Sequence, residues 1–156
     1  MLYNVLLVVL VIVAVLVIGM IRESRRERSL RAWVEKKTNA RLHWPFKADE
    51  HPSVPAAELT QLFIQRPPLG FASAVQITEA GSELWLIEFR TTPLGKESSR
   101  WFTLVARRAM NETPPESSAG SSGESWKVFG PWACHHREGL ITVSLLEEAL
   151  STPQHL

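Results

Sequence analysis

The feature that most constrains this chain is an apolar run, because every residue from Val5 to Ile21 is apolar or glycine. As a helix, its 17 residues are about 26 Å long, and residues 2–4 extend it to about 30 Å. This matches the hydrocarbon core of a bilayer, where a single segment must be helical because unpaired backbone groups are too costly. The run therefore predicts one transmembrane helix, and a chain of 156 residues has room for one small domain beside it.

A cleaved signal peptide is the alternative interpretation of this run. Signal peptides carry positive residues before a shorter apolar stretch and small residues at a cleavage site. Here no Lys or Arg precedes the run, and it ends in Gly19-Met20-Ile21 without an A-x-A pattern. We therefore expect an uncleaved anchor. The expected plan is an anchor at 1–21, a basic juxtamembrane helix at 22–38, a domain at 39–150 and a tail at 151–156.

Charge predicts the orientation of the anchor. Residues 22–37, which we name the basic collar, contain seven basic and three acidic side chains, whereas residues 38–156 contain ten basic and thirteen acidic ones. The positive-inside rule then predicts a single-pass inner (plasma) membrane protein with its N-terminus outside and its domain in the cytoplasm. The acidic domain argues against a nucleic-acid partner. The residues expected at the membrane surface are Arg22, Arg25, Arg26, Arg28 and Arg31.

The basic collar contains no Pro or Gly, so it is expected to continue the membrane helix. Leu30, Trp33 and Val34 have i, i+3, i+4 spacing and share one helix face. This face lies either on the membrane or on the domain. We favour the domain, because three apolar residues make a weak membrane-binding face.

The remaining sequence predicts an α+β domain with an antiparallel β-meander and one or two short helices. Alternating residues indicate three consecutive strands joined by short loops. Residues 39–55 are interrupted by prolines, and residues 110–125 form a flexible loop by composition. The expected elements are a helix at 56–65, strands at 71–78, 83–92 and 100–109, further strands at 126–129 and 140–146, and a helical turn at 147–150.

The order of these segments resembles a loosely defined family of uncharacterised bacterial single-span membrane proteins. The sequence Leu30-Arg-Ala-Trp33 is similar to the family's Leu-x-x-Trp in an Arg-rich helix. Phe89-Arg-Thr-Thr-Pro-Leu-Gly-Lys-Glu-Ser98 and the strand from Trp101 to Ala106 are similar to its β-hairpin, although Arg90 and Thr91 replace a tyrosine-containing stretch. The resemblance covers residues 22–108 and implies a small cytoplasmic β-rich domain, with no activity attached.

Cys134-His135-His136 is the densest cluster of reactive side chains. On a strand, Cys134 and His136 share a side, and a zinc site is conceivable if His43 or His51 lies nearby. The spacing matches no standard ligand pattern, so we expect no catalytic, metal or cofactor site.

Two basic motifs have simpler interpretations. Gly95-Lys96 lacks the upstream glycine and following helix of a phosphate-binding P-loop, which favours a turn with a solvated lysine. Arg107-Arg108 follows two aromatic residues but is expected to be an exposed strand end rather than a nucleic-acid site.

The six tryptophans give the strongest indication of function. Trp85 and Trp101 are expected in the core, whereas Trp44, Trp126 and Trp132 neighbour prolines and are expected to be partly exposed partner contacts. The lead hypothesis is a non-enzymatic accessory or interaction protein that docks onto another membrane protein, in an unknown oligomeric state. The alternatives are a membrane-tethered enzyme or metal site using Cys134 and His136, and an anionic-lipid-binding module using the basic collar.

Overall fold

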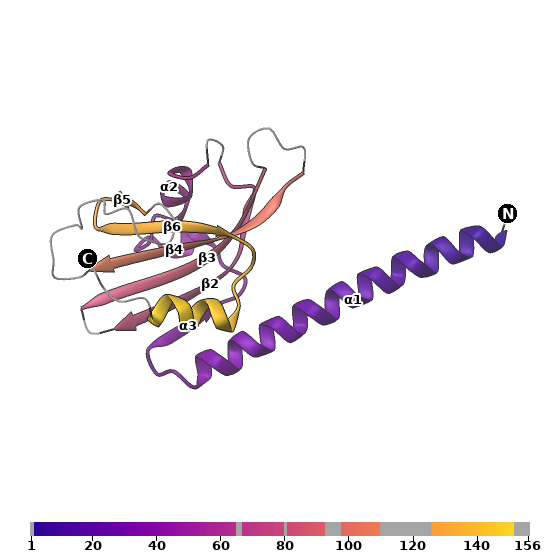
Figure 1. The fold of residues 1–156 in the computed structure, drawn as a ribbon, viewed down its shortest axis with the longest axis horizontal. Helices are drawn as coiled ribbons and strands as arrows, with labels where there is room; N and C mark the ends of the chain where they lie inside the picture. The colour runs from indigo at the N-terminus through magenta and orange to yellow at the C-terminus, as the bar shows by residue number, and fades with distance from the viewer. Residues whose placement is uncertain (1, 65–66, 80, 93–97, 110–125, 152–156) are drawn as a thin grey trace.

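The computed structural model describes residues 2–64, 67–79, 81–92, 98–109 and 126–151. It begins with one uninterrupted helix, α1 (Leu2–Glu35), which projects from a sheet domain (Figure 1). At about 1.5 Å per residue, its 34 residues span about 51 Å. The apolar half is long and apolar enough to cross a membrane, and none of its apolar window is buried inside the protein.

A six-stranded antiparallel sheet forms the domain, with strand order β1-β2-β3-β4-β6-β5. The expected meander is confirmed, because β2, β3 and β4 pair consecutively in antiparallel register. Together with the helices this confirms the α+β class. The strands are β1 (Ala40–His43), β2 (Gly70–Glu79), β3 (Ser82–Thr91), β4 (Arg100–Ala109), β5 (Lys127–Phe129) and β6 (Trp132–Glu138).

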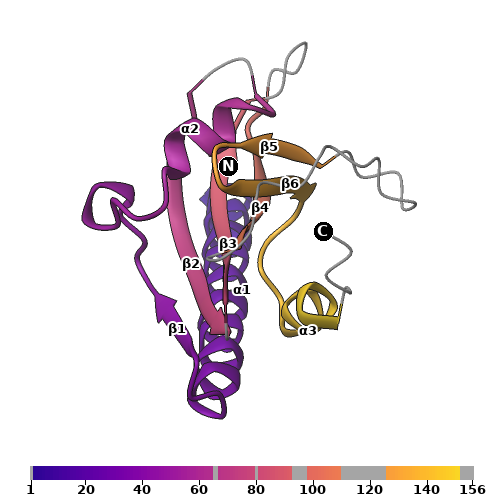
Figure 2. The ribbon, with the colours of Figure 1, turned by 90° about the vertical axis from the view of Figure 1, so that its left-hand side faces the viewer.

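One face of the sheet packs against the segment between β1 and β2. That segment contains a 3-10 turn, η1 (Ala48–Glu50), and the short helix α2 (Ala56–Gln61). Odd-numbered residues of β3 point to this face, which is why Trp85, Ile87 and Phe89 belong to its core. Viewed from the end opposite the N-terminus, α2 and the C-terminal helix α3 (Val143–Ser151) lie on opposite sides of the sheet (Figure 2).

The other face is covered by α3 and by the C-terminal part of α1. Leu30 and Trp33 are buried there, and Val34 packs against the same cluster. The apolar face of the basic collar therefore packs on the domain, as we expected, rather than on a membrane. Residues 30–34 are consequently part of the folded domain as well as of the helix.

Three elements differ from the sequence-based expectation. The predicted strand at 140–146 is wrong, because Val143 begins α3 and the Thr142 hydroxyl accepts a hydrogen bond from Leu145 N at 3.2 Å, as an N-cap does. Strand β6 was not predicted as an element. The expected helix at 56–65 ends at Gln61. The predicted flexible loop (110–125) and the Gly95-Lys96 turn lie outside the described residues, as does the tail beyond Ser151.

Candidate functional site

A buried carboxylate connects α1 to the sheet. Glu88 lies on central strand β3 and is 0% exposed. It points to the α1 face, because residues alternate along a strand and Leu84 and Leu86 belong to that face. A buried ion of this kind is stable only when it is paired and hydrogen-bonded.

Glu88 receives hydrogen bonds from three separate segments. The Ser73 hydroxyl on β2 donates to Oε2 at 2.7 Å, and the Ile141 backbone N–H donates to Oε1 at 2.7 Å. The Arg26 guanidinium on α1 bonds to both oxygens, through Nη1 to Oε1 and through Nη2 to Oε2 at 3.3 Å. Each carboxylate oxygen therefore has two donors, so the hydrogen-bonding sites of the group are occupied.

Arg26 itself is held on several sides. Its side chain is 15% exposed, and Nη2 also contacts Glu23 at 2.8 Å. The guanidinium carbon lies 4.8 Å from the centroid of the Trp44 ring, a cation–π distance. Together these contacts join α1 to β2, β3 and the segment before α3. We name Arg26, Trp44, Ser73, Glu88 and Ile141 the helix–sheet junction.

The sequence contains two signals for this junction, although neither was used to predict it. Glu88 occupies the Leu84–Leu86 face of a strand that was predicted to be central, so its charge needed a buried partner. Arg26 lies one helical turn before Leu30, on the face that was predicted to pack against the domain. Each signal marks its residue as one that needs a partner, but neither identifies the other residue as that partner.

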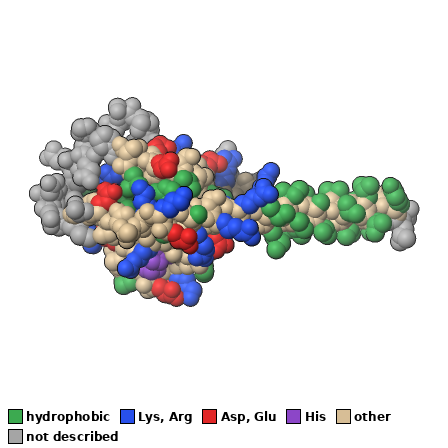
Figure 3. Space-filling model, turned by 90° about the horizontal axis from the view of Figure 1, so that it is seen from below, with side chains coloured by type: hydrophobic (Ala, Val, Ile, Leu, Met, Phe, Trp, Pro, Cys, Tyr) green, Lys and Arg blue, Asp and Glu red, His purple; other side chains and the backbone are tan. Residues whose placement is uncertain are grey.

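The other predicted membrane-surface arginines have a different environment from Arg26. Arg22, Arg25, Arg28 and Arg31 are exposed. Basic side chains gather where the apolar half of the helix meets the domain (Figure 3). Arg26 instead points into the domain.

The three tryptophans that were expected to be partly exposed do not all behave alike. Trp44 and Trp126 are partly exposed, as expected, and they contact Arg26 and, at 4.4 Å between ring centroids, His135. Trp132 is 2% exposed, so the expectation is wrong there: its indole lies in the α2-side core, with Arg108 5.4 Å above the ring. Conversely, Trp101 was expected in the core but is partly exposed.

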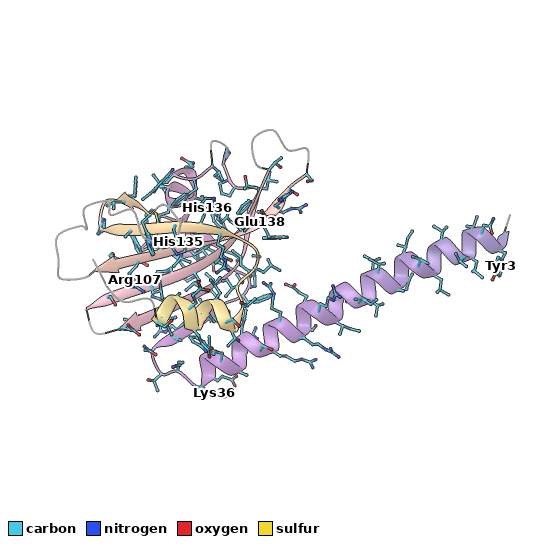
Figure 4. All side chains as sticks on the ribbon, viewed as in Figure 1. Tyr3, Lys36, Arg107, His135, His136 and Glu138 are labelled. Carbon is cyan, nitrogen blue, oxygen red and sulfur yellow. The ribbon has the colours of Figure 1, made fainter. Side chains whose placement is uncertain are left out.

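Cys134 and His136 do share one side of β6, as the alternation predicts. Burial raises the pKa of the Cys134 thiol to about 11, partly offset by nearby Lys127. The thiol donates to the Lys127 carbonyl at 3.3 Å. His136 packs against Phe63 at 4.6 Å, while His135 lies on the other face (Figure 4). A nucleophilic cysteine requires a lowered pKa, and this one is raised.

His43 and His51 do not approach Cys134. Their ring centroids are 4.2 Å apart, and His43 stacks on Trp85 at 5.4 Å. Desolvation, followed by the nearby His51, lowers the pKa of His43. Strand β1 is four strands from β6, or about 19 Å, so the conceivable zinc site is not assembled. Among the described residues no group of three or more His, Cys, Asp or Glu side chains is placed to hold a metal.

The two adjacent arginines of β4 are half-buried rather than exposed. Arg107 donates to the Ala149 carbonyl of α3 at 2.8 Å, and Arg108 lies 3.3 Å from Glu83. Both therefore have intramolecular partners, and the expectation of a solvated strand end is wrong for them.

An open pocket of about 330 Å³ lies between the end of β6 and α3. Thr103, Arg137 and Glu148 are among the residues that line it, and the last two form an ion pair at 3.0 Å. A ligand in this pocket would therefore have to break that ion pair in order to bind either side chain.

The described chain thus forms a small antiparallel sheet domain built onto the end of a long helix with an exposed apolar half. Comparisons with protein-family models, with curated proteins and with solved structures found no match. The resemblance to the single-span membrane family stays a prediction.

Proposed function

We propose that the chain is a single-pass inner-membrane protein that acts as a non-enzymatic accessory subunit, its domain docking onto other membrane proteins. In this proposal the apolar half of α1 spans the bilayer, the N-terminus is outside and the domain is cytoplasmic. The observation that carries it is the continuity of α1, whose exposed apolar half leads without a break into a half locked by the helix–sheet junction.

The spacing along α1 supports a position at the membrane surface. Arg26 follows Ile21 by five residues, or about 7.5 Å of helix. Each headgroup layer adds about 5–7 Å to the hydrocarbon core, so the junction would lie at the outer limit of that layer. A domain held this close and without a flexible linker presents a fixed side to its neighbours in the same membrane.

The best-supported second function is binding of anionic lipid through the basic collar. The supporting observation is the exposure of Arg22, Arg25, Arg28 and Arg31 around the helix. Each such cation contributes about 1 kcal/mol near an anionic surface. The same exposure is also expected if these arginines only set the orientation of the helix in the membrane and bind no particular lipid.

Co-purification of the tagged full-length protein in mild detergent tests the accessory role. Mass spectrometry should find another membrane protein at near-equal stoichiometry. A matched variant carries a six-residue Gly-Ser linker between Arg22 and Glu23, which leaves both the anchor and the junction residues unchanged. We expect it to remain in the membrane but recover less partner. Recovery of the protein alone, or as a homo-oligomer, would contradict the proposal.

A further inference from the structure

One end of the sheet extends in the same direction as the apolar half of α1. The C-terminal end of α1 is joined by a short turn to Ala40, which pairs with Ile77, and Ile77 in turn pairs with Leu84 of β3. At the other end of their contact, Arg26 meets Glu88. The direction from the C-terminus to the N-terminus of α1 is therefore the same as the direction from the N-terminus to the C-terminus of β3.

The stretches of α1 and β3 that lie against each other have matching lengths. From Glu35 to Arg26 the helix covers about 13.5 Å, and from Leu84 to Glu88 the strand covers about 13 Å. Beyond the junction, Glu88 to Thr91 adds about 10 Å, whereas Arg26 to Ile21 adds about 7.5 Å. The end of β3 and the start of β4 therefore reach the level at which the apolar run begins, on the same side of the molecule (Figure 1).

The side chains at this end suit a lipid surface. Leu69 is 65% exposed, and its N–H donates to the Arg90 carbonyl at 2.7 Å. Arg90 is exposed and pairs in register with the partly exposed Trp101, so both lie on the face that carries α1. Neighbouring Arg100 is also exposed, although it pairs with Glu138 at 2.8 Å. Tryptophan beside arginine is typical of the membrane–water interface.

From this placement we infer a second membrane contact, made by the sheet itself. The membrane-facing end of the sheet, defined as Leu69, Arg90, Arg100 and Trp101, rests on the anionic surface of the bilayer that α1 enters. The inference rests on the proposed membrane anchor but not on the accessory role. The domain then has two attachments to the bilayer, and its tilt is fixed by both.

The opposite end of the sheet offers a matched control. Outside α1, two large apolar side chains are exposed among the described residues, Leu69 at 65% and Phe129 at 41%. Through its pairing with Trp132, Phe129 lies beside Arg108 of β4. Through its hydrogen bond to Arg90, Leu69 lies beside Trp101 of β4. Seven residues of β4 separate these two positions, or about 23 Å.

The test places an environment-sensitive fluorophore on one introduced cysteine at a time in the full chain, reconstituted in vesicles of phosphatidylcholine with phosphatidylglycerol. The variants are Leu69→Cys, Phe129→Cys and Val13→Cys. Cys134 is buried, and the labelled parent chain gives its background. Quenching by a nitroxide lipid labelled near the headgroup should be at least two-fold stronger at position 69 than at 129. A nitroxide deep in the acyl chains should quench position 13.

Each outcome has a separate meaning. Equal, weak quenching at 69 and 129 with deep quenching at 13 overturns the second contact and leaves the anchor in place. Absence of quenching at 13 overturns the anchor itself. Protection of position 69 in native membranes but not in lipid vesicles overturns the lipid contact in favour of a protein partner.

A charge variant tests the anionic preference. Adding Arg90→Gln to the Leu69→Cys chain should at least halve the quenching at position 69, whereas Arg41→Gln, an exposed arginine on β1, should leave it unchanged. An equal effect of both substitutions overturns the role of Arg90.

Discussion

Glu88 is an ionisable residue whose surroundings use all of its hydrogen-bonding capacity. Replacing it with alanine leaves the Ile141 N–H without this acceptor and leaves the exposed Glu23 as the carboxylate beside the Arg26 guanidinium. Removing one member of a buried ion pair typically costs about 3–5 kcal/mol, so we expect Glu88→Ala to lower the free energy of unfolding by that amount. The measurement is denaturant unfolding of the full chain in detergent.

Glu23 is the matched control, because it contacts the same guanidinium at 2.8 Å but is 54% exposed. Glu23→Ala should cost less than about 1 kcal/mol, as exposed ion pairs do. If the two alanine variants lower the free energy of unfolding by similar amounts, burial does not determine how strongly Arg26 binds its two carboxylates.

Cys134 allows a prediction about reactivity and pH. Only the thiolate reacts with alkylating agents, and a pKa of about 11 instead of 9.0 makes the thiolate about 100-fold rarer at pH 8. Alkylation should therefore be at least 100-fold slower in the folded chain than in denaturant, as measured by mass spectrometry. Because the folded-state pKa is raised, this group's contribution to stability is complete below pH 9 and is lost between about pH 9 and 11. Equal alkylation rates in both states would contradict the buried position.

At the scale of elements, α1 combines two environments in one helix. Leu30 is 1% exposed against the sheet, whereas Leu16 is 62% exposed in the apolar half. Leu30→Ala should destabilise the domain by about 2–5 kcal/mol, the usual cost of a large-to-small change in a core. Leu16→Ala, the same substitution on the same helix, should leave domain unfolding unchanged. Domain unfolding is followed by near-ultraviolet circular dichroism, and a small effect of Leu30→Ala would contradict the packing of α1 on the sheet.

The sequence predicted elements best where one periodicity dominated. Strands β2, β3 and β4 alternate clearly, and the residues Leu30, Trp33 and Val34 show the helical face that packs on the sheet. The α3 segment was harder, because it is preceded by β-branched residues that favour a strand, and the helical spacing of Leu145, Leu146 and Ala149 overlaps the same apolar run. The Thr142 cap favours the helix, and capping is a local contact rather than a hydrophobic pattern.

The junction was harder to predict for a different reason. Pairing Arg26 with Glu88 joins residues 62 positions apart, and no local pattern specifies such a distance. Strand order has the same property, because β6 pairs with β4 through contacts remote in sequence, such as Ala106 with Cys134. Trp132 was expected near the surface because Pro131 precedes it, but on strand β6 its side chain points into the core.

At the scale of the whole molecule, the exposed arginines of the basic collar make a prediction about topology. Replacing Arg22, Arg25, Arg28 and Arg31 with glutamine removes four positive charges without touching the junction. We expect a mixed orientation, because the charge bias that retains a flank in the cytoplasm is weakened. The measurement uses C-terminal fusions, comparing fluorescence of a cytoplasm-active reporter with activity of a periplasm-active phosphatase.

The matched control replaces the same four residues with lysine. This variant keeps the charge and should keep the domain in the cytoplasm. If the glutamine variant shows the same single orientation as the lysine variant, the basic collar does not set the topology.

The continuity of α1 also has a consequence for how partners meet. Two free proteins lose translational and rotational freedom when they associate, at an estimated cost of about 4–15 kcal/mol. If the apolar half of α1 spans the bilayer as proposed, the domain diffuses in the plane of the membrane, and rotation about the membrane normal is its main remaining freedom. Much of the entropy of alignment is then lost at insertion, before the proposed partner is met. That partner, in the same bilayer, would therefore recognise the domain through a smaller patch than a freely diffusing protein needs.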